Sequence, residues 1–251
     1  MGNIQIEFSA EDVQEIKRSM DMGLGFKLGL GVGNVGVTVT RGLPAALSTA
    51  AVWFDAREGV DGTAQTWTDR NNSVVATVPA SSVFPTVETE NAIVGGAALV
   101  WPSTNLNNTR LQFTPTACAY IMIVAAYVDG SQATFFNLDR PFNGSDFDQS
   151  GASSTNAWGG GTTYSNLNQS RKNGGTLTDV VLPLAGDIVE FEDTGTGGNL
   201  LNTIGNFAAT GTNRGWRGPI SQVLGWTTKP TESELIAVRE YFADLYGITL
   251  A

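Results

Sequence analysis

Short apolar or alternating runs recur along most of the chain, and residues that favour turns separate them. Runs of this length, rich in Val, Ile, Phe, Tyr and Trp, are typical of β-strands. The predicted strands occupy residues 51–54, 64–67, 92–94, 98–101, 110–113, 120–128, 134–138, 180–182, 188–191 and 220–226. Many short strands with frequent turns predict an antiparallel, all-β sandwich. The stretch from 139 to 175 is nearly all polar residues and Gly, so we expect long loops there.

A helix is predicted at the end of the chain. Thr231 is a suitable N-cap, and Glu234 three residues later completes a capping box. Gly247 supplies the left-handed residue that ends a helix. The apolar positions between them follow helical spacing and are Leu235, Val238, Phe242 and Leu245. We therefore expect an amphipathic helix of about 15 residues that lies on the sandwich.

Residues 1–41 have a different pattern. Ser9 is a suitable N-cap, and Val13, Ile16 and Met20 follow at helical spacing, which predicts a short amphipathic helix. Gly42 and Pro44 are breakers just after this part. We therefore expect residues 1–41 to form a separate N-terminal segment and residues 45–251 to form one domain.

An alternation of glycine and apolar residues follows the predicted first helix. Gly occupies every second position from 23 to 33 except for Lys27, and the positions between are Leu24, Phe26, Leu28, Leu30 and Val32. As a strand, this segment has one apolar face and one nearly bare face. A flexible linker is the alternative, but linkers use polar residues rather than Leu and Phe at period two. We expect an assembly segment that pairs with another chain.

Composition narrows the possible chemistry. The chain has 251 residues, a formal net charge of -10, 30 Gly, no His and one Cys. The acidic balance argues against binding to nucleic acid. Without His there is no His-based triad or metal site, and Cys118 lies in an apolar run, which favours a small buried side chain over a nucleophile.

Two features of the sequence bear on where the protein resides. The N-terminal residues lack the basic start and apolar core of a secretory signal peptide, so we expect no leader. The longest apolar run, residues 117–128, is too short to span a membrane.

Four phrases resemble those of the concanavalin A-like (laminin G-like) domains. Trp53-Phe54-Asp55-Ala56 and Trp67-Thr68-Asp69 resemble the opening "W-x-D-A … W-x-D" of that family. Gly218-Pro219-Ile220-Ser221-Gln222-Val223 resembles its "G-x-I-x-E-V" strand, and Tyr246-Gly247 resembles the end of its closing helix. Gln222 stands where the family usually has Glu, and Leu245 where it often has Lys. The resemblance covers residues 48–251 and implies a jelly-roll sandwich, in which Trp53 and Trp67 are expected in the core.

Some proteins of this fold are glycosidases, so paired acids are relevant. Glu190 and Glu192 are two residues apart in a predicted strand and therefore share one face, whereas Asp187 falls on the opposite face. The family's catalytic pattern has three acids on the same face of the strand. We expect instead a strand with its apolar residues inward and its acids in water.

The polar stretch contains a candidate glycan site. Lectin-like domains stack aromatic side chains on sugar rings and use Asn and Asp for the hydroxyls, and the residues of these kinds here are Trp158, Tyr164, Asn143, Asp146 and Asp148. A hydrophilic loop pinned by its aromatic residues is the alternative. Asn143, Asp146 and Asp148 could offer oxygen ligands to Ca²⁺, but they match no defined calcium loop, so we expect no cofactor.

Taken together, these features predict a non-enzymatic structural protein of a phage virion. Domains of this kind occur in phage structural proteins, and a virion protein needs no leader. We expect a head-fibre, decoration or tail-fibre subunit, located in the virion, whose partners are capsid or tail proteins, sister chains in a homotrimer, and host-surface polysaccharide. A free carbohydrate-binding lectin module and a glycosidase that uses Glu190 and Glu192 are the alternatives.

Overall fold

The computed structural model describes residues 43–71, 74–80, 82–101, 109–127, 134–139, 146–148, 169–176, 184–192, 199–205 and 216–251. These residues belong to the second of two units into which the chain divides, Gly42–Ala251. The predicted helix near Ser9, the assembly residues Leu24, Phe26, Leu28, Leu30 and Val32, and the run 180–182 lie outside the described residues.

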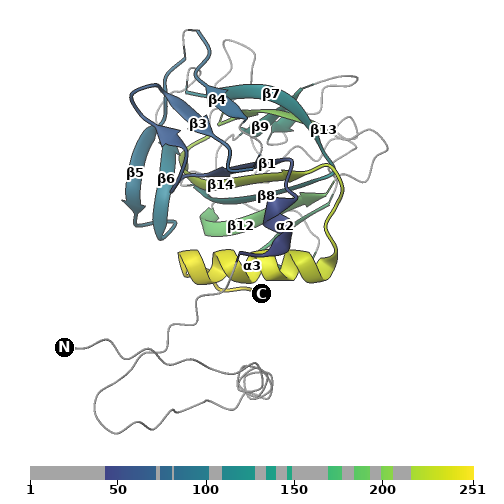
Figure 1. Ribbon diagram of the computed structural model, residues 1–251. Helices are drawn as coiled ribbons and strands as arrows, with labels where there is room; N and C mark the ends of the chain where they lie inside the picture. The colour runs from purple at the N-terminus through teal and green to yellow at the C-terminus, as the bar shows by residue number, and fades with distance from the viewer. Residues whose placement is uncertain are drawn as a thin grey trace, which may run out of the picture. The chain divides into compact units, whose positions relative to one another are not determined.

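Two antiparallel sheets make up most of the described chain (Figure 1). Sheet A has the order β11 (Gln169–Lys172), β12 (Leu184–Glu192), β8 (Tyr120–Tyr127), β14 (Gly218–Trp226), β6 (Gly96–Trp101) and β5 (Thr86–Asn91), and β1 (Val52–Asp55) also pairs with β14. Sheet B has the order β10 (Asp146–Asp148), β9 (Thr134–Asp139), β13 (Asn199–Ile204), β7 (Leu111–Cys118), β4 (Val75–Thr77), β3 (Thr66–Thr68) and β2 (Val60–Asp61). The short helix α2 (Ala45–Ser48) precedes β1, and α3 (Glu232–Tyr246) follows β14.

The first core lies between the sheets. Phe54 from sheet A meets Trp67 and Phe113 from sheet B at ring-centroid distances of 5.4 and 5.0 Å. Such tilted and edge-to-face contacts suit the charge distribution of aromatic rings. Trp67 and Cys118 are fully buried in this core, as the sequence predicts, and burial raises the pKa of the Cys118 thiol to about 12. At neutral pH the thiol is protonated, so it behaves as a small apolar side chain.

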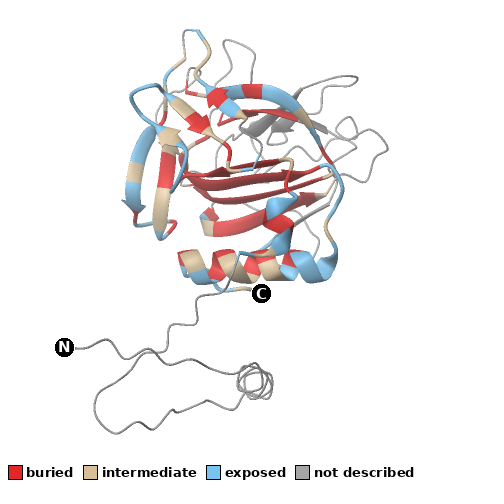
Figure 2. Ribbon diagram, in the orientation of Figure 1, coloured by how far each residue is buried: buried red, intermediate tan, exposed pale blue. Residues whose placement is uncertain are grey.

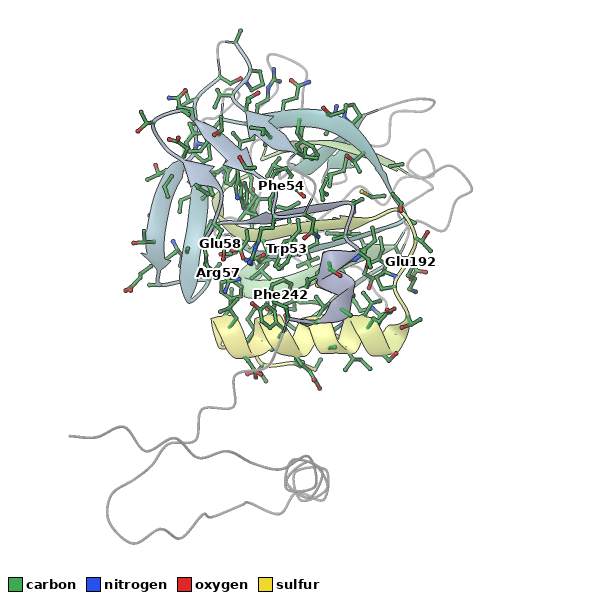
Figure 3. All side chains as sticks on the ribbon, viewed as in Figure 1. Trp53, Phe54, Arg57, Glu58, Glu192 and Phe242 are labelled. Carbon is green, nitrogen blue, oxygen red and sulfur yellow. The ribbon has the colours of Figure 1, made fainter. Side chains whose placement is uncertain are left out.

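The second core lies between sheet A and helix α3. Leu235, Val238 and Phe242 of α3 pack on residues of β8 and β14, including Met122 and Leu224. Strand β1 supplies both cores, because Phe54 faces sheet B while Trp53 packs in the core beneath α3 (Figure 3). Sheet A is therefore buried on both faces, and Figure 2 shows its central strands as continuously buried.

The closing helix confirms the prediction from its caps. Thr231 caps the first turn, Glu234 completes the capping box, and Gly247 ends the helix in the left-handed conformation with φ of 67°. Leu245 is only half-buried, and Tyr246 is the buried residue of the last turn. None of the described helices is both long and apolar enough to cross a membrane.

The strand predictions differ from the structure in several places, and strands β2, β4 and β13 lie where none was predicted. Residues 92–94 form the turn between β5 and β6, because the side chain of Asn91 accepts hydrogen bonds from the backbone of Ile93 and Val94. Strand β5 itself was not predicted, since its sequence is almost entirely polar. The polar stretch expected to be loops also contributes two strands, β10 and β11.

We expect Thr231→Ala to lower the free energy of unfolding by about 1 kcal/mol, because the first turn of α3 loses its side-chain cap. Urea denaturation measures this change. Ile236→Ala is the matched control on the same helix, since Ile236 is 46% exposed and its truncation should cost less than about 0.5 kcal/mol. Equal stability of the two variants would contradict the role of the cap.

Candidate functional site

The two outer faces of the sandwich differ in what covers them. Helix α3 and the short α2 both lie against sheet A, where the indole N–H of Trp226 donates to the carbonyl of Ala46 at 2.8 Å. Neither of the helices in the described part of the chain lies on sheet B (Figure 1). The helices of the described part of the chain therefore leave the outer face of sheet B uncovered.

The open face of sheet B is built by strict alternation along its strands. Trp67, Ala76 and Phe113 point into the core between the sheets, so their neighbours in sequence point outward. The outward residues are polar and uncharged, Thr66, Thr68, Thr77, Gln112 and Thr114, except for Val75, which is 43% exposed and lies opposite Thr68. Register brings them side by side, because Thr66 lies opposite Thr77 and Thr77 lies opposite Gln112. Hydroxyl and amide groups both donate and accept hydrogen bonds, which suits a neutral ligand rich in hydroxyl groups.

The predicted glycan residues fall at the other end of the same sheet or outside the described residues. Asp146 and Asp148 lie in β10, the edge strand of sheet B, where Asp146 pairs with Asn137 of β9. Asn143, Trp158 and Tyr164 lie outside the described residues. Their grouping with the two aspartates stays a prediction. Within the described residues no group of three or more acidic or Cys side chains could hold a metal ion.

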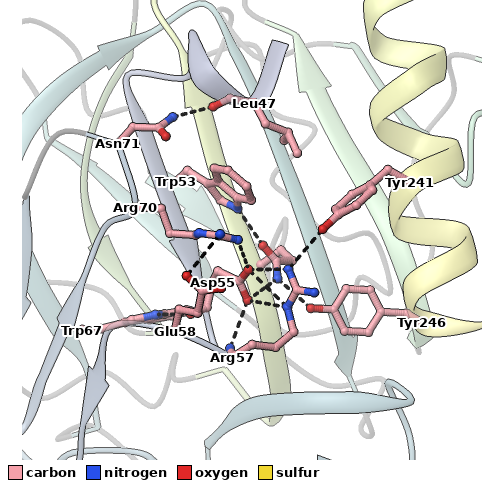
Figure 4. Close-up of polar contacts among 11 residues, drawn as sticks. Leu47, Trp53, Asp55, Arg57, Glu58, Trp67, Arg70, Asn71, Tyr241 and Tyr246 are labelled. Atoms are coloured by element: carbon pink, nitrogen blue, oxygen red, sulfur yellow. Dashed lines mark hydrogen bonds and ion pairs between the residues drawn. The ribbon is translucent and has the colours of Figure 1, made fainter. Parts of the chain in front are cut away.

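A buried carboxylate, Asp55 at the end of β1, organises the polar residues beneath α3 (Figure 4). Arg57 binds both carboxylate oxygens, with its Nε 3.0 Å from Oδ1 and its Nη2 2.5 Å from Oδ2. Arg70 adds a contact of 2.9 Å to Oδ2 and stacks over the ring of Trp53. Two arginines on one buried carboxylate compensate for the loss of its hydration.

Gln222 of β14 connects Asp55 to the end of α3. Its amide nitrogen donates to Asp55 Oδ1 at 2.7 Å and to the hydroxyl of Tyr246 at 2.6 Å. Its amide oxygen accepts from the indole N–H of Trp53 at 2.8 Å. We call Asp55, Arg57, Arg70, Gln222 and Tyr246, with Trp53, the Asp55 cluster. An amide fits between Trp53 and Asp55 because one end accepts and the other donates.

The ionisation of Asp55 follows from these contacts. Burial by itself raises the pKa of a carboxyl, but the hydrogen bonds and the charge of Arg57, joined by Gln222, outweigh burial and hold the pKa of Asp55 below its ordinary value of 3.8. The folded state therefore favours the carboxylate. Its contribution to stability is present above the unfolded pKa and is lost as the pH falls through the folded pKa.

A second buried carboxylate, Glu190 of β12, anchors the middle of α3. Arg239 of α3 reaches its two oxygens at 2.8 and 2.9 Å, and the Tyr120 hydroxyl donates to it at 2.5 Å. Arg239 also contacts Glu232 in the first turn of the same helix at 2.6 Å. We call Glu190, Arg239, Tyr120 and Glu232 the Glu190 cluster. Burial is the main cause that raises the pKa of Tyr120, and the charge of Glu190 adds to it, so the phenol stays a donor.

The surroundings of Glu190 and Glu192, the paired acids of β12, differ from each other in the structure. Glu190 is 1% exposed, so the prediction that the acids of β12 lie in water is wrong for it. The reason is that helix α3 covers this face and brings Arg239 to meet the charge. Glu192 is more exposed and pairs with Lys229 at 2.6 Å. Asp187 accepts from the side chain of Asn173 at 2.7 Å. A carboxylate held by an arginine beneath a helix is not open to a polysaccharide chain.

Sequence reasoning missed the partners of both carboxylates. Arg239 carried a signal, because it sits within the apolar stripe of α3, one residue after Val238 and three before Phe242. A charged residue on the buried stripe of a helix indicates an opposite charge beneath it. Arg57 and Arg70 carried no such signal, since they follow their strands in turns.

Comparisons of the chain with protein-family models, with curated proteins and with solved structures found no match.

We expect Arg239→Met to lower the free energy of unfolding by about 3–5 kcal/mol, because Glu190 is left buried without its ion-pair partner. The double variant Glu190→Gln/Arg239→Met removes both charges and should recover most of that loss. Urea denaturation of the parent, both single variants and the double variant gives the coupling between the two side chains. A double variant no more stable than Arg239→Met would contradict a charge-pairing role.

We expect Asp55→Asn to lower the free energy of unfolding at pH 7 by roughly 3 kcal/mol, since the arginines and Gln222 lose a buried carboxylate. The deficit should shrink as the pH falls below about 4, where the parent loses the same carboxylate by protonation. Denaturation curves between pH 3 and pH 7 measure both effects (roughly the range over which a carboxyl titrates). Asp244→Asn on the exposed side of α3 is the control, and a deficit for Asp55→Asn that is independent of pH would contradict the assignment.

Proposed function

We propose that the chain is a non-enzymatic structural protein of a phage virion, a head-fibre, decoration or tail-fibre subunit. In this proposal residues 45–251 form a concanavalin A-like jelly roll that displays a binding surface for host glycan, and residues 1–41 hold the subunit in a homotrimer or on the particle. The observation that carries the binding role is the contrast between the two outer faces. Helix α3 closes one, and the other presents Thr and Gln side chains with the exposed Val75 among them.

The Asp55 cluster supports the concanavalin A-like part of the proposal. Trp53, Asp55, Gln222 and Tyr246 belong to phrases that lie far apart in the sequence and that resemble the family. In the structure these four residues share one hydrogen-bonded network. A structural role of this kind explains why the phrases occur together, since each residue depends on the others for its hydrogen bonds.

The chemistry of the open face supports a neutral glycan as the ligand. Thr66, Thr68, Thr77, Gln112 and Thr114 carry no charge, and they lie on a rigid sheet rather than on a loop. A sheet holds side chains at fixed spacing, which lowers the entropy lost on binding. Asp146 and Asp148 lie in β10 at the edge of the same sheet, and Asn143, Trp158 and Tyr164 remain predicted members of the glycan site.

The Glu190 cluster favours binding over hydrolysis. Of the two acids in the glycosidase alternative, Glu190 is engaged by Arg239 and Tyr120 beneath α3. The free lectin module remains as the alternative that shares the binding surface and lacks the assembly.

The test of the binding role is an array of bacterial surface polysaccharides, with arabinose and galactose included, probed with the full chain. We expect a neutral glycan to bind with an affinity that changes little with salt, because no charge pairs form. Gln112→Ala and Trp158→Ala should each weaken binding about tenfold, which corresponds to about 1.4 kcal/mol. Ser233→Ala on α3 is the control and should bind like the parent.

Two outcomes would contradict the binding role. The first is an absence of binding to every glycan on the array. The second is binding that Gln112→Ala and Trp158→Ala both leave at the parent's level. Release of reducing sugar from a bound polysaccharide, abolished by Glu190→Gln, would establish the glycosidase alternative instead.

A further inference from the structure

Sheet A has a long open edge. The strands at the ends of the two sheets are β5 and β11 in sheet A and β2 and β10 in sheet B, and β1 pairs only with β14 while Asp69 and Arg70 bind the backbone of its Trp53. Strand β5 has six residues, and the other three end strands have four, two and three. Among the described strands only β6 pairs with β5, so one side of β5 offers its backbone groups to another strand (Figure 1). An edge of this length is the part of a sheet that most readily accepts a strand from another chain.

Apolar side chains gather at this edge. The described residues include six large hydrophobic side chains that are exposed, and three of them lie on β5 or within three residues of its ends. These are Val83, Val87 and Ile93, with exposed fractions of 58, 40 and 46%. Isolated exposed hydrophobic residues need no explanation, but a group along an open edge strand indicates a contact surface.

The two sides of β5 differ in charge. Val87 lies opposite Leu99, which belongs to the core between the sheets, so Val87 stands on the side of sheet B. Glu88 lies opposite Ala98 on the other side, and the exposed Glu90 lies in the register shift that follows, between Glu88 and Asn91. A strand that pairs with β5 would therefore meet an apolar side chain on one side and the carboxylate of Glu88 on the other, with a second carboxylate in the irregular part of the edge.

The segment with alternating Gly and apolar residues has the matching pattern. In a strand, Leu24, Phe26, Leu28, Leu30 and Val32 would share one face, and Lys27 would be the single side chain among the glycines of the other face. Residues 22–41 contain Lys27 and Arg41 and no acidic residue. With its apolar face beside Val87, this segment would place Lys27 on the same side as Glu88, two residues from Glu90 in the sequence of β5.

We propose that residues 24–32 of a neighbouring copy pair with β5 as an added strand of sheet A. The apolar residues of the segment continue the core between the sheets past Val87, and Lys27 pairs with Glu90 or Glu88. On the other face of the added strand, the glycines would leave no large side chain except that of Lys27. This inference rests on the assembly role proposed above, and it names the surface that receives the assembly segment.

The pairing is tested on the full chain by light scattering coupled to size exclusion, over a range of concentrations. We expect the parent to have about three times the mass of 26.5 kDa. Phe26→Asp/Leu28→Asp should give the monomer mass, because a charged face cannot continue an apolar core. Lys27→Glu should raise the dissociation constant of the assembly about tenfold, and Glu90→Lys should do the same. The exchange variant Lys27→Glu/Glu90→Lys should return to the parent's value.

Controls separate the contact from general effects of charge and folding. Asp244→Lys makes the same charge change as Glu90→Lys on the exposed side of α3, and it should assemble like the parent. Glu90 is chosen over Glu88 because Glu88 accepts a hydrogen bond from Asn91 in the turn after β5. Thermal unfolding of each variant checks the domain. If Glu90→Lys does not fold, Lys27→Glu still tests the pairing, since it leaves every residue of the described domain unchanged.

The possible results separate a failure of the β5 contact from a failure of the assembly role. If the parent assembles and Lys27→Glu and Glu90→Lys both assemble like it, the receiving surface is not β5, while the assembly role stands. If both weaken assembly and the exchange variant does not recover, the two charges do not meet and the register is wrong. If the parent is a monomer at every concentration, both the pairing with β5 and the homotrimer are wrong, whatever the glycan array shows.

Discussion

The domain depends on one buried charge, the carboxylate of Asp55. Three side chains and one backbone N–H bind it, and they come from the turn after β1, the loop after β3 and the central strand β14. Through Gln222 the same network reaches the last turn of α3. A buried charge destabilises the fold unless opposite charges and hydrogen-bond donors compensate for its lost hydration. All these segments must therefore be in their correct positions at the same time. The Asp55 cluster thus couples the beginning of the domain to its end.

The second buried charge adds a constraint of another kind. Glu190 and Arg239 join α3 to β12, at a point where the apolar contacts alone would let the helix rotate or slide on the sheet. An apolar interface tolerates small shifts, whereas a two-point contact between a guanidinium and a carboxylate does not. Together the two clusters define both the position and the rotation of the helix that closes sheet A.

The sequence predicts the elements that depend on local patterns and misses those that depend on distant partners. The caps of α3 and the burial of Trp53, Trp67 and Cys118 follow from short-range signals. Strand β5 was missed because its backbone pairs with β6 while its side chains remain polar. Glu190 was expected in water because its partner lies 49 residues away, and no pattern within β12 indicates that a helix will cover it. The chemistry of the open face of sheet B was missed for the same reason, since Thr66, Thr77 and Gln112 become neighbours only through pairing.

The arrangement of the sandwich has a consequence for how the protein can change. Sheet A is enclosed by sheet B on one side and by α3 on the other, so most substitutions in β8 or β14 alter packing and stability. The outward residues of sheet B contact little of the core, and substitutions there leave the fold almost untouched. Selection can therefore alter the open surface residue by residue while the enclosed layer keeps its sequence. A new specificity then requires no compensating change in the framework.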